Sequence, residues 1–498
     1  MQHRLGWLLV ITLPLTSLGF LTLANTARAQ IAPDNTLGAE SSVVTPDTIN
    51  GIPSERIDGG ATRGANLFHS FEDFNVGEGR GAYFSNPAAI ENILSRVTGS
   101  NPSNILGTLG VLGDANLFLL NPNGIVFGPN ARLDVRGSFL GSTADSLVFD
   151  NGFEFSASNP QAPPLLTVNI PIGLRFRENP GNIINQSVEQ DLLNGNPVGL
   201  QVPTGKSIGL VGGNVNLSSG GRLTAAEGRV ELGGLAGVGT VGLTLDDNNL
   251  SLSFPTDSQL AKVTLAEDAR VSVLGLGGGN IFVNANIFAA TDGGRLVAGT
   301  GGARNGEDIT VNANTVNLSG EGVNAGSGLY NQALPGSTGN AGNIIVNTQL
   351  FTADSGSGLT IVIGGTGNGG DIILNADQIN LSGVGNISGL GSGLYNQALS
   401  DSTGNAGNIF INSRSFRTTS GATVNADTSS AGNGGNIQIV STDLVELIDG
   451  KIETRATECA TGDAGNILIT PLSSNGTKMY AKAATATQQA FQPLVQRF

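Results

Sequence analysis

The sequence has little cysteine, little histidine and few charged or aromatic residues, and these shortages exclude several kinds of protein. Cys459 is the only cysteine among 498 residues, so no disulfide can form within the chain. One cysteine and two histidines cannot supply the clustered ligands of a zinc site. After residue 29 no stretch is long and apolar enough to span a membrane. The stability of the fold must therefore come from the packing of the chain itself.

Glycine is abundant instead, with 74 residues, which is roughly twice its ordinary usage. The glycines do not recur at every third position, which excludes a collagen triple helix. A hydrophobic fraction of 39% and a mean hydropathy of +0.07 are too high for a disordered Gly/Ser linker. Stacked β-structure fits this composition, because Gly and Asn accept positive φ at tight corners.

The N-terminus is typical of an export signal. Arg4 precedes a mostly apolar stretch, Leu5–Ala24, and a small-x-small cleavage site ends at Ala29, before Gln30. We expect residues 1–29 to be a signal peptide that is cleaved between Ala29 and Gln30. The apolar stretch is also long enough for a membrane anchor, but the adjoining cleavage site favours removal.

The chain is strongly acidic. Cleavage would remove two arginines and no acid, which changes the formal net charge from −15 to −17. This charge argues against nucleic acid or anionic lipid as the main partner.

Internal repeats are the strongest structural signal in the sequence. Residues 326–351 match residues 391–416 at 19 of 26 positions, an offset of 65. A shorter unit, in which Asn or Asp precedes Ile after a small or polar turn, recurs at steps of 28, 35, 28, 37, 28 and 30 residues. The isoleucines of this unit are Ile281, Ile309, Ile344, Ile372, Ile409, Ile437 and Ile467.

Each unit has the pattern of short strands. Residues 344–347 and 372–375 place residues i and i+2 on one face of a strand, and an Asn follows at once, where we expect the chain to turn. A second short strand follows, as in residues 316–320. A unit of 28 to 37 residues leaves too little room for a helix. The sequence therefore predicts an all-β protein, a right-handed parallel β-helix in which apolar side chains and corner asparagines stack from coil to coil.

Residues 31–150 differ in kind, since they are richer in Phe and lack the repeat. Specific motifs occur here: Asn66–Phe71, Ala115–Leu120 and, directly after the latter, Asn121-Pro122-Asn123-Gly124-Ile125 (NPNGI). This block resembles the N-terminal haemagglutination activity domain of filamentous haemagglutinin-type two-partner secretion exoproteins, the TpsA family. A second family motif, NPNL, is not intact, and its nearest counterpart is residues 86–89, Asn-Pro-Ala-Ala.

The resemblance implies a β-helical secretion domain that a TpsB-type outer-membrane transporter recognises in the periplasm. It implies an adhesin-like protein, secreted or on the cell surface, with a cell-surface or carbohydrate ligand. The expected segments are the signal peptide (1–29), the haemagglutination activity domain (30–150), its β-helix continuation (151–275), the Gly-Asn-Ile repeat β-helix (276–475) and a C-terminal tail or cap (476–498).

Two interpretations of NPNGI stand side by side. Asn121 to Ile125 form the secretion motif that the resemblance implies, and the transporter could bind it directly. The same residues also form a turn on physical grounds, since Pro presets φ and Asn-Gly accepts positive φ, so the motif could merely shape a loop that folding needs.

No catalytic, cofactor or metal site is predicted. Gly205-Lys206-Ser207 lacks the earlier glycine of a phosphate-binding loop, and His69 stands in an aromatic strand where packing is expected. Because parallel β-helices can host carbohydrate-active enzymes, the acidic run at residues 443–453 is an alternative site, although such a run usually marks a solvated face. Asp308 and Asp371 replace Asn in sister repeats, which predicts a corner role.

The sequence leaves calcium binding, the length of the native protein and the role of the cysteine open. The Gly-rich residues 364–372 faintly resemble calcium-binding nonapeptides, but the repeat is about 28 residues long, not nine. The chain could be a truncated copy of a longer exoprotein, or a toxin-delivery stalk, although no distinct globular domain follows the repeats. Cys459 could be inert or form an intermolecular disulfide.

Overall fold

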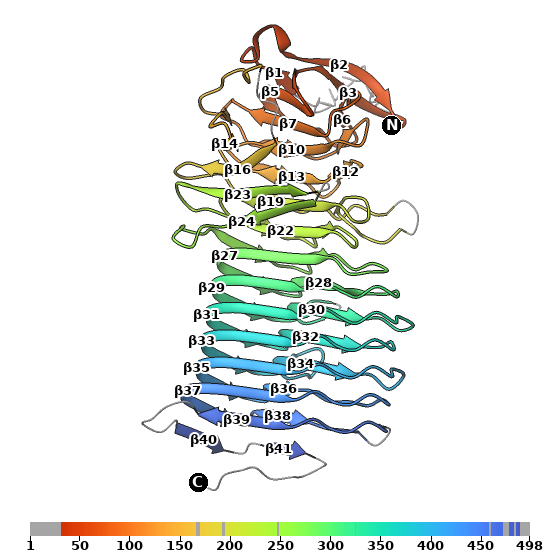
Figure 1. The fold of residues 1–498 in the computed structure, drawn as a ribbon, viewed down its shortest axis with the longest axis vertical. Helices are drawn as coiled ribbons and strands as arrows, with labels where there is room; N and C mark the ends of the chain where they lie inside the picture. The colour runs from red at the N-terminus through yellow and green to blue at the C-terminus, as the bar shows by residue number, and fades with distance from the viewer. Residues whose placement is uncertain are drawn as a thin grey trace, which may run out of the picture.

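The chain folds into a long parallel β-helix, as Figure 1 shows for a computed structural model. The structure describes residues 31–165, 170–191, 195–246, 249–323, 325–457, 460–471, 478–482 and 485–488. Within them there is one short 3-10 helix, η1 (Gly38–Glu40), and no α-helix. The parallel β-helix predicted from the sequence is confirmed. The predicted signal peptide, with the cleavage position at Ala29 and Gln30, and Cys459 lie outside the described residues.

One sheet, here called the long sheet, runs the length of the molecule and contains 21 of the described strands. These are β1 (Ile31–Pro33), β4 (Ala61–Arg63), β5 (Asn66–Phe74), β7 (Asn92–Val97), β8 (Ser103–Ile105), β10 (Asn116–Leu120), β11 (Ile125–Phe127), β13 (Phe139–Ser142), β17 (Ile183–Asn185), β19 (Ser207–Gly212), β20 (Val215–Leu217), β22 (Arg229–Gly234), β25 (Lys262–Leu265), β27 (Asn280–Thr291), β29 (Ile309–Ser319), β31 (Ile344–Asp354), β33 (Ile372–Ser382), β35 (Ile409–Thr419), β37 (Ile437–Ile448), β39 (Ile467–Pro471) and β40 (Lys478–Lys482).

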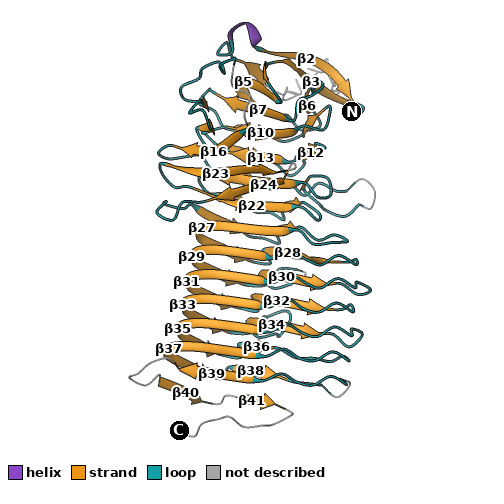
Figure 2. Ribbon diagram, in the orientation of Figure 1, coloured by secondary structure: helices purple, strands orange, loops and turns teal. Residues whose placement is uncertain are grey.

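Three smaller sheets complete the fold (Figure 2). The N-terminal sheet contains β2 (Ser42–Ile49), β3 (Ile52–Gly59), β6 (Gly81–Phe84), β9 (Thr108–Val111) and β12 (Arg132–Asp134). The C-terminal sheet contains β18 (Leu200–Gln201), β21 (Arg222–Thr224), β26 (Arg270–Ser272), β28 (Arg295–Thr300), β30 (Gly328–Ala333), β32 (Gly358–Ile363), β34 (Gly393–Ala398), β36 (Thr423–Asn425), β38 (Lys451–Thr454) and β41 (Thr485–Gln488). The antiparallel outer sheet contains β14 (Ser146–Phe149), β15 (Glu154–Ser156), β16 (Pro171–Phe176), β23 (Gly239–Asp246) and β24 (Asn249–Ser253).

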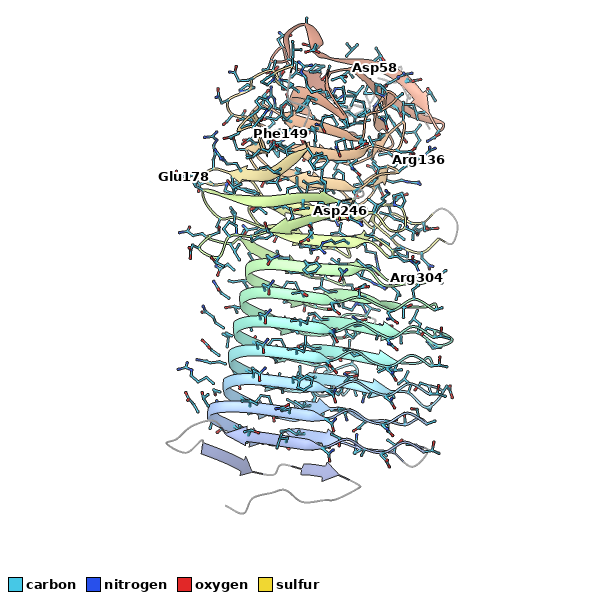
Figure 3. All side chains as sticks on the ribbon, in the orientation of Figure 1. Asp58, Arg136, Phe149, Glu178, Asp246 and Arg304 are labelled. Atoms are coloured by element: carbon cyan, nitrogen blue, oxygen red, sulfur yellow. The ribbon has the colours of Figure 1, made fainter. Side chains whose placement is uncertain are left out.

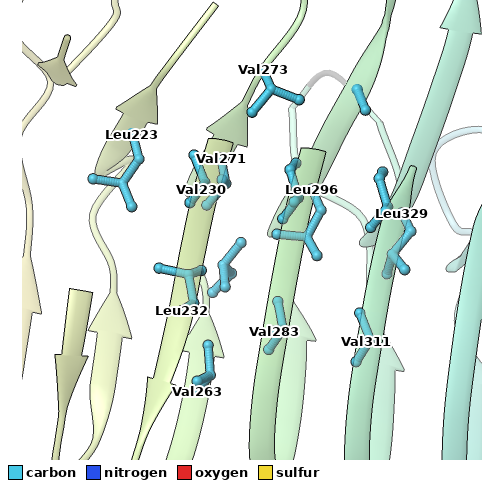
Figure 4. Packing of buried hydrophobic residues seen from close by; sticks show 14 of the residues in the cluster. Leu223, Val230, Leu232, Val263, Val271, Val273, Val283, Leu296, Val311 and Leu329 are labelled. Carbon is cyan, nitrogen blue, oxygen red and sulfur yellow. The ribbon is translucent and has the colours of Figure 1, made fainter. Parts of the chain in front are cut away.

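The core is a set of columns of identical or similar side chains. Ile309, Ile344, Ile372, Ile409 and Ile437 are paired in register from strand to strand, and all are fully buried. Parallel strands lie about 4.8 Å apart, so each isoleucine contacts the next one along the column. Figure 4 shows other buried residues of this core. A single coil could not bury such a face alone, so the coils stabilise each other.

The two short strands expected in each repeat are joined into one continuous strand. In β31, Ile344 and Val346 are buried, then the phase shifts, and Phe351 and Ala353 are buried. The Asn does not end the strand, since Asn347 stays paired with Asn312 and Asn375. The pairing is interrupted just after it, at Gln349, and the buried phase changes there within one long strand.

Asparagines stack along the corner that precedes each long strand. The backbone N–H of Asn408 donates to Asp371 Oδ1 (2.7 Å), and that of Asn436 donates to Asn408 Oδ1 (3.1 Å). Asp308 occupies the same column and accepts from the N–H of Asn343 (2.8 Å). The corner role predicted for Asp308 and Asp371 is confirmed, because each carboxylate replaces an amide oxygen as the acceptor.

Glycine is required where the connecting loops stack along one edge of the β-helix (Figure 2). A Cβ on Gly407 would lie 1.9 Å from the carbonyl oxygen of Gly370, and one on Gly435 would lie 1.8 Å from that of Gly407. The column continues at Gly465. The neighbouring coil thus occupies the space of a side chain, which accounts for part of the high glycine content.

The outer sheet explains why the N-terminal part is rich in phenylalanine. In β10, Leu117 and Leu119 point into the main core, whereas Phe118 and Leu120 join a second core under the outer sheet. Phe149 of β14, labelled in Figure 3, belongs to this second core. Strands here are buried on both faces and consequently have nearly continuous apolar sequences.

Candidate functional site

NPNGI forms the corner between β10 and β11. The N–H of Gly124 donates to the carbonyl of Asn121 (3.1 Å), which closes the turn, and Gly124 has a φ of +127° that favours glycine. Asn121 is fully buried, and its Oδ1 accepts from the N–H (3.0 Å) and the amide (3.2 Å) of Asn123. The motif is thus a preorganised turn around one buried side chain.

The corner is also bonded to the coil before it. Asn121 Nδ2 donates to the carbonyl of Asn101 and to Ser103 Oγ, both at 3.0 Å. Asn123 Nδ2 donates to the carbonyl of Gly99 (2.8 Å). Substitution of either asparagine by alanine would remove the hydrogen bonds that its amide makes. At the buried Asn121, the partner groups would then be left without a hydrogen bond, because water cannot replace the amide there.

The coil after it carries a second Asn-Pro corner, at Asn179-Pro180-Gly181-Asn182-Ile183, with the same spacing. The N–H of Gly181 donates to the carbonyl of Pro122 (2.8 Å), and that of Ile125 donates to the carbonyl of Asn182 (3.1 Å). The sequence reasoning missed this second corner, although the repeated Asn-Pro was a usable signal.

The motif offers little surface. Asn123 is exposed and Pro122 half-buried, whereas Asn121, Gly124 and Ile125 are buried. Any protein that binds this corner must therefore contact Asn123 and Pro122, while the other three residues hold them in place.

The incomplete second motif, residues 86–89, is a turn as well. Asn86 Nδ2 donates to the carbonyls of Pro87 and Ile90, both at 3.1 Å, and its Oδ1 accepts from the N–H of Ala115 (2.9 Å). Ala89 has a φ of +68°, a conformation that costs an alanine free energy. The asparagine keeps a structural role even though the rest of the motif has changed.

A buried polar cluster closes the N-terminal end of the β-helix. Arg96 is fully buried; its Nε donates to Ser70 Oγ and its Nη2 to Thr36 Oγ1, both at 2.9 Å, and its guanidinium lies 4.1 Å from the ring centroid of Phe155. Burial lowers the pKa of Arg96 to about 10. Burial opposes ionisation of Asp34, but hydrogen bonds, first that from Thr36, keep its pKa below the usual value. The cluster joins the segment after β1 to the long sheet and the outer sheet.

The side chain of His69 is packed inside the N-terminal part of the protein. Its ring is fully buried beside Phe71 and Phe84, and Nδ1 lies 3.0 Å from Ser42 Oγ. Its Nε2 has no partner among the described residues. Burial lowers the pKa of His69 to about 3, so the ring is neutral near pH 7. The predicted packing of His69 is confirmed.

Carboxylates of the acidic run at residues 443–453 form ion pairs with nearby arginines. Glu446 pairs with Arg417 (2.5 Å), and Glu453 pairs with Arg455 (3.2 Å). Asp443 is exposed, as expected for a solvated face, but Glu453 is buried, so that expectation was wrong for it. Its position on β38 brings it against Arg455 and away from water.

Metal clusters and membrane-spanning helices are both absent from the described residues. No group of three or more His, Cys, Asp or Glu side chains in these ranges could hold a metal ion. No helix among them is long and apolar enough to cross a membrane.

Comparison with known proteins gives one family and several relatives. The family described as the TPS secretion domain matches residues 29–283. The HMW1 secretion domain from Haemophilus influenzae has a similar fold, with a TM-score of 0.51 at 16% identity over 89% of this chain and all of that domain. The filamentous hemagglutinin secretion domain aligns over 91% of this chain and 99% of its own length with a TM-score of 0.30 at 13% identity. A heme/hemopexin-binding protein of Haemophilus influenzae is 32% identical over 82 residues, which are 16% of this chain and 9% of that relative.

Proposed function

Because the chain belongs to the two-partner secretion family of filamentous haemagglutinin type, we propose that it is an adhesin-like exoprotein that a TpsB-type transporter exports through the outer membrane. We propose further that residues 1–29 are its cleaved signal peptide, and that the exported chain acts at the cell surface or after release. In this proposal it functions by binding, through a cell-surface or carbohydrate ligand, and not by catalysis.

The match of the family over residues 29–283 carries this proposal. The NPNGI corner lies within the match and presents the side chain of Asn123 on a rigid turn. We propose that the transporter contacts Asn123 and Pro122. The segment shared with the heme/hemopexin-binding relative is a small part of that protein, so the binding in its name is not assigned to this chain.

An export assay with two exposed asparagines tests the proposal. The full chain is produced in a Gram-negative host with and without a cognate TpsB transporter, and periplasm, cell surface and medium are probed by immunoblot. Asn123→Ala should reduce export by roughly tenfold, the effect of losing about 1.4 kcal/mol of recognition. Asn214→Ala is the matched control, since Asn214 is exposed and bonded to the preceding coil through Asn182 Oδ1 (3.0 Å).

Folding must be measured alongside export. Equal melting temperatures of the two variants, with a defect for Asn123→Ala alone, support direct recognition. Equal export of both variants would mean that NPNGI only shapes the loop. Export that does not depend on the transporter would contradict the secretion route itself.

A further inference from the structure

Three arginines on consecutive coils of the C-terminal sheet stack into what we call the arginine column: Arg222 of β21, Arg270 of β26 and Arg295 of β28. Arg222 pairs in register with Arg270, and Arg270 with Arg295. The next residue on each strand (Leu223, Val271 and Leu296, labelled in Figure 4) is buried in the core. Since side chains alternate along a strand, the arginines lie on the outer face of the sheet.

The column concentrates positive charge in an acidic protein. Coils repeat at about 4.8 Å, so neighbouring guanidinium groups repel one another. Most other described arginines have a carboxylate in contact, as in the pair of Arg63 with Glu40 at 2.7 Å. Among the described residues, the column has only Asp268, whose Oδ1 is 4.0 Å from Arg295 Nη2.

The guanidinium groups are also short of hydrogen bonds. The Nε atoms of Arg222, Arg270 and Arg295 are buried and have no acceptor within the described part of the chain, and Arg270 Nη2 reaches Ser272 Oγ only at 3.5 Å. Burial, and then the charges of Arg295 and Arg222, lower the pKa of Arg270 to about 10. Three buried or half-buried cations with free donors are an arrangement that an anion would stabilise.

The column is only partly exposed. Arg222 and Arg270 are half-buried, and Arg295 is 9% exposed. The column ends at glycines on both sides: Gly328 pairs with Arg295, and Gly199 precedes the strand that pairs with β21. The residues opposite Arg295 and Arg222 in the flanking coils are therefore glycines, which have no side chain to cover either end of the column.

We propose that the arginine column is a binding site for an oxyanion, a phosphate, a sulfate or the carboxylate of an acidic saccharide. The planar fork of each guanidinium matches two oxygens of such a group, and adjacent forks can share one anion. The site lies on the β-helix body away from the NPNGI corner, and it does not depend on the proposed export route.

Phosphate binding by the purified full chain tests this site. The melting temperature is measured in sodium phosphate and in sodium chloride of the same ionic strength, and affinity is measured by calorimetry. Wild type should melt at a higher temperature in phosphate, because a ligand that binds only the folded state stabilises it. Arg270→Gln should weaken phosphate binding at least about tenfold. Arg136→Gln is the matched control, since it removes the same charge at a different place. The side chain of Arg136, labelled in Figure 3, is 76% exposed.

Each outcome decides the proposal. Phosphate stabilisation of wild type and Arg136→Gln that is lost in Arg270→Gln supports it. No phosphate effect on wild type, or an equal effect on all three proteins, overturns it. If Arg270→Gln does not fold, Arg222→Gln at the half-buried end of the column gives the same readout.

A competition experiment identifies the source of the oxyanion. An oligogalacturonate that displaces phosphate from wild type assigns the site to saccharide carboxylates. Phosphate binding that oligogalacturonate does not affect assigns it to phosphate or sulfate.

Discussion

At the scale of single residues, the N-terminal part depends on polar side chains that are buried but satisfied. Arg96 donates to Ser70, Thr36 and the carbonyl of Ser156 (3.0 Å), so its charge stays solvated by the protein. His69 is the contrast, since its Nε2 has no described partner and the ring can be buried only while neutral.

This predicts a pH dependence of stability. The folded-state pKa of His69, about 3, lies below the unfolded value near 6.5, so the unfolded state binds the proton first as pH falls. The contribution of neutral, buried His69 to the free energy of unfolding is fully present above pH 6.5 and is lost as pH falls towards 3. When the pH is lowered from 7 to 5, protonation of His69 in the unfolded state should lower the free energy of unfolding of wild type by about 2 kcal/mol. Denaturant titration at the two pH values measures this change.

His69→Gln is the matched variant, because an amide does not titrate. It should be less stable at pH 7, yet its loss of stability between pH 7 and pH 5 should be about 2 kcal/mol smaller. Parallel pH dependence in both proteins would show that His69 is not the group that titrates.

At the scale of elements, each strand of the repeat region is held by its neighbours in three ways: the backbone ladder, the isoleucine column and the asparagine corners. The glycines of the connecting loops make the close approach of coils possible. Asn396 shows how these parts join: it is buried in β34, its amide donates to the carbonyl of Gly370 (2.8 Å), and its Oδ1 accepts from the N–H of Gly407 (3.1 Å).

Substitution of a loop glycine should therefore be costly. A Cβ at Gly407 would lie 1.9 Å from the carbonyl oxygen of Gly370, so two coils would have to separate. Gly407→Ala should lower the free energy of unfolding by about 2 kcal/mol or more, measured by denaturant titration.

Gly301→Ala is the control, since its nearest neighbour, the carbonyl oxygen of Gly275, is 3.5 Å from the added Cβ. It should change stability by about 0.5 kcal/mol or less. Equal effects of the two substitutions would contradict the steric explanation.

At the scale of the whole molecule, the two ends are built differently. The N-terminal part has two cores because the outer sheet covers the long sheet, whereas the repeat region has one core. Its strands pair only with those of adjacent coils, although the loop residue Glu321 also accepts a hydrogen bond from the N–H of Ile387, two coils further on (2.6 Å). Such a solenoid gains stability coil by coil.

We therefore expect a chain truncated after Thr300 to keep a folded N-terminal part. It retains the second core, the N-terminal part of the main core and the complete outer sheet, and it should give β-type circular dichroism and a protease-resistant fragment. A chain truncated after residue 235 loses β23 and β24, exposes Leu174 and Phe176 and should be degraded. Equal protease sensitivity of both truncations would contradict a self-sufficient N-terminal part.

The β-helix could be predicted from the sequence alone, because the spacing of the repeated Asn-Ile or Asp-Ile pairs is the length of one coil. The family, through NPNGI, and the corner role of Asp308 and Asp371 could be predicted as well. These features could be predicted because each depends on residues close together in sequence, and the same arrangement recurs from coil to coil.

Which of these residues face water could not be predicted, since that depends on contacts between segments far apart in sequence. Asn121 and Asn123 are alike in the motif, yet one is buried under an adjoining coil and the other exposed. Glu453 looked solvated, but its strand pairs it in register with Asn425 of the adjacent coil and it is buried. The arginine column was invisible in the sequence, because Arg222, Arg270 and Arg295 lie at unequal intervals and become neighbours only when insertions of different length, including the β23–β24 hairpin, are excluded from the coil.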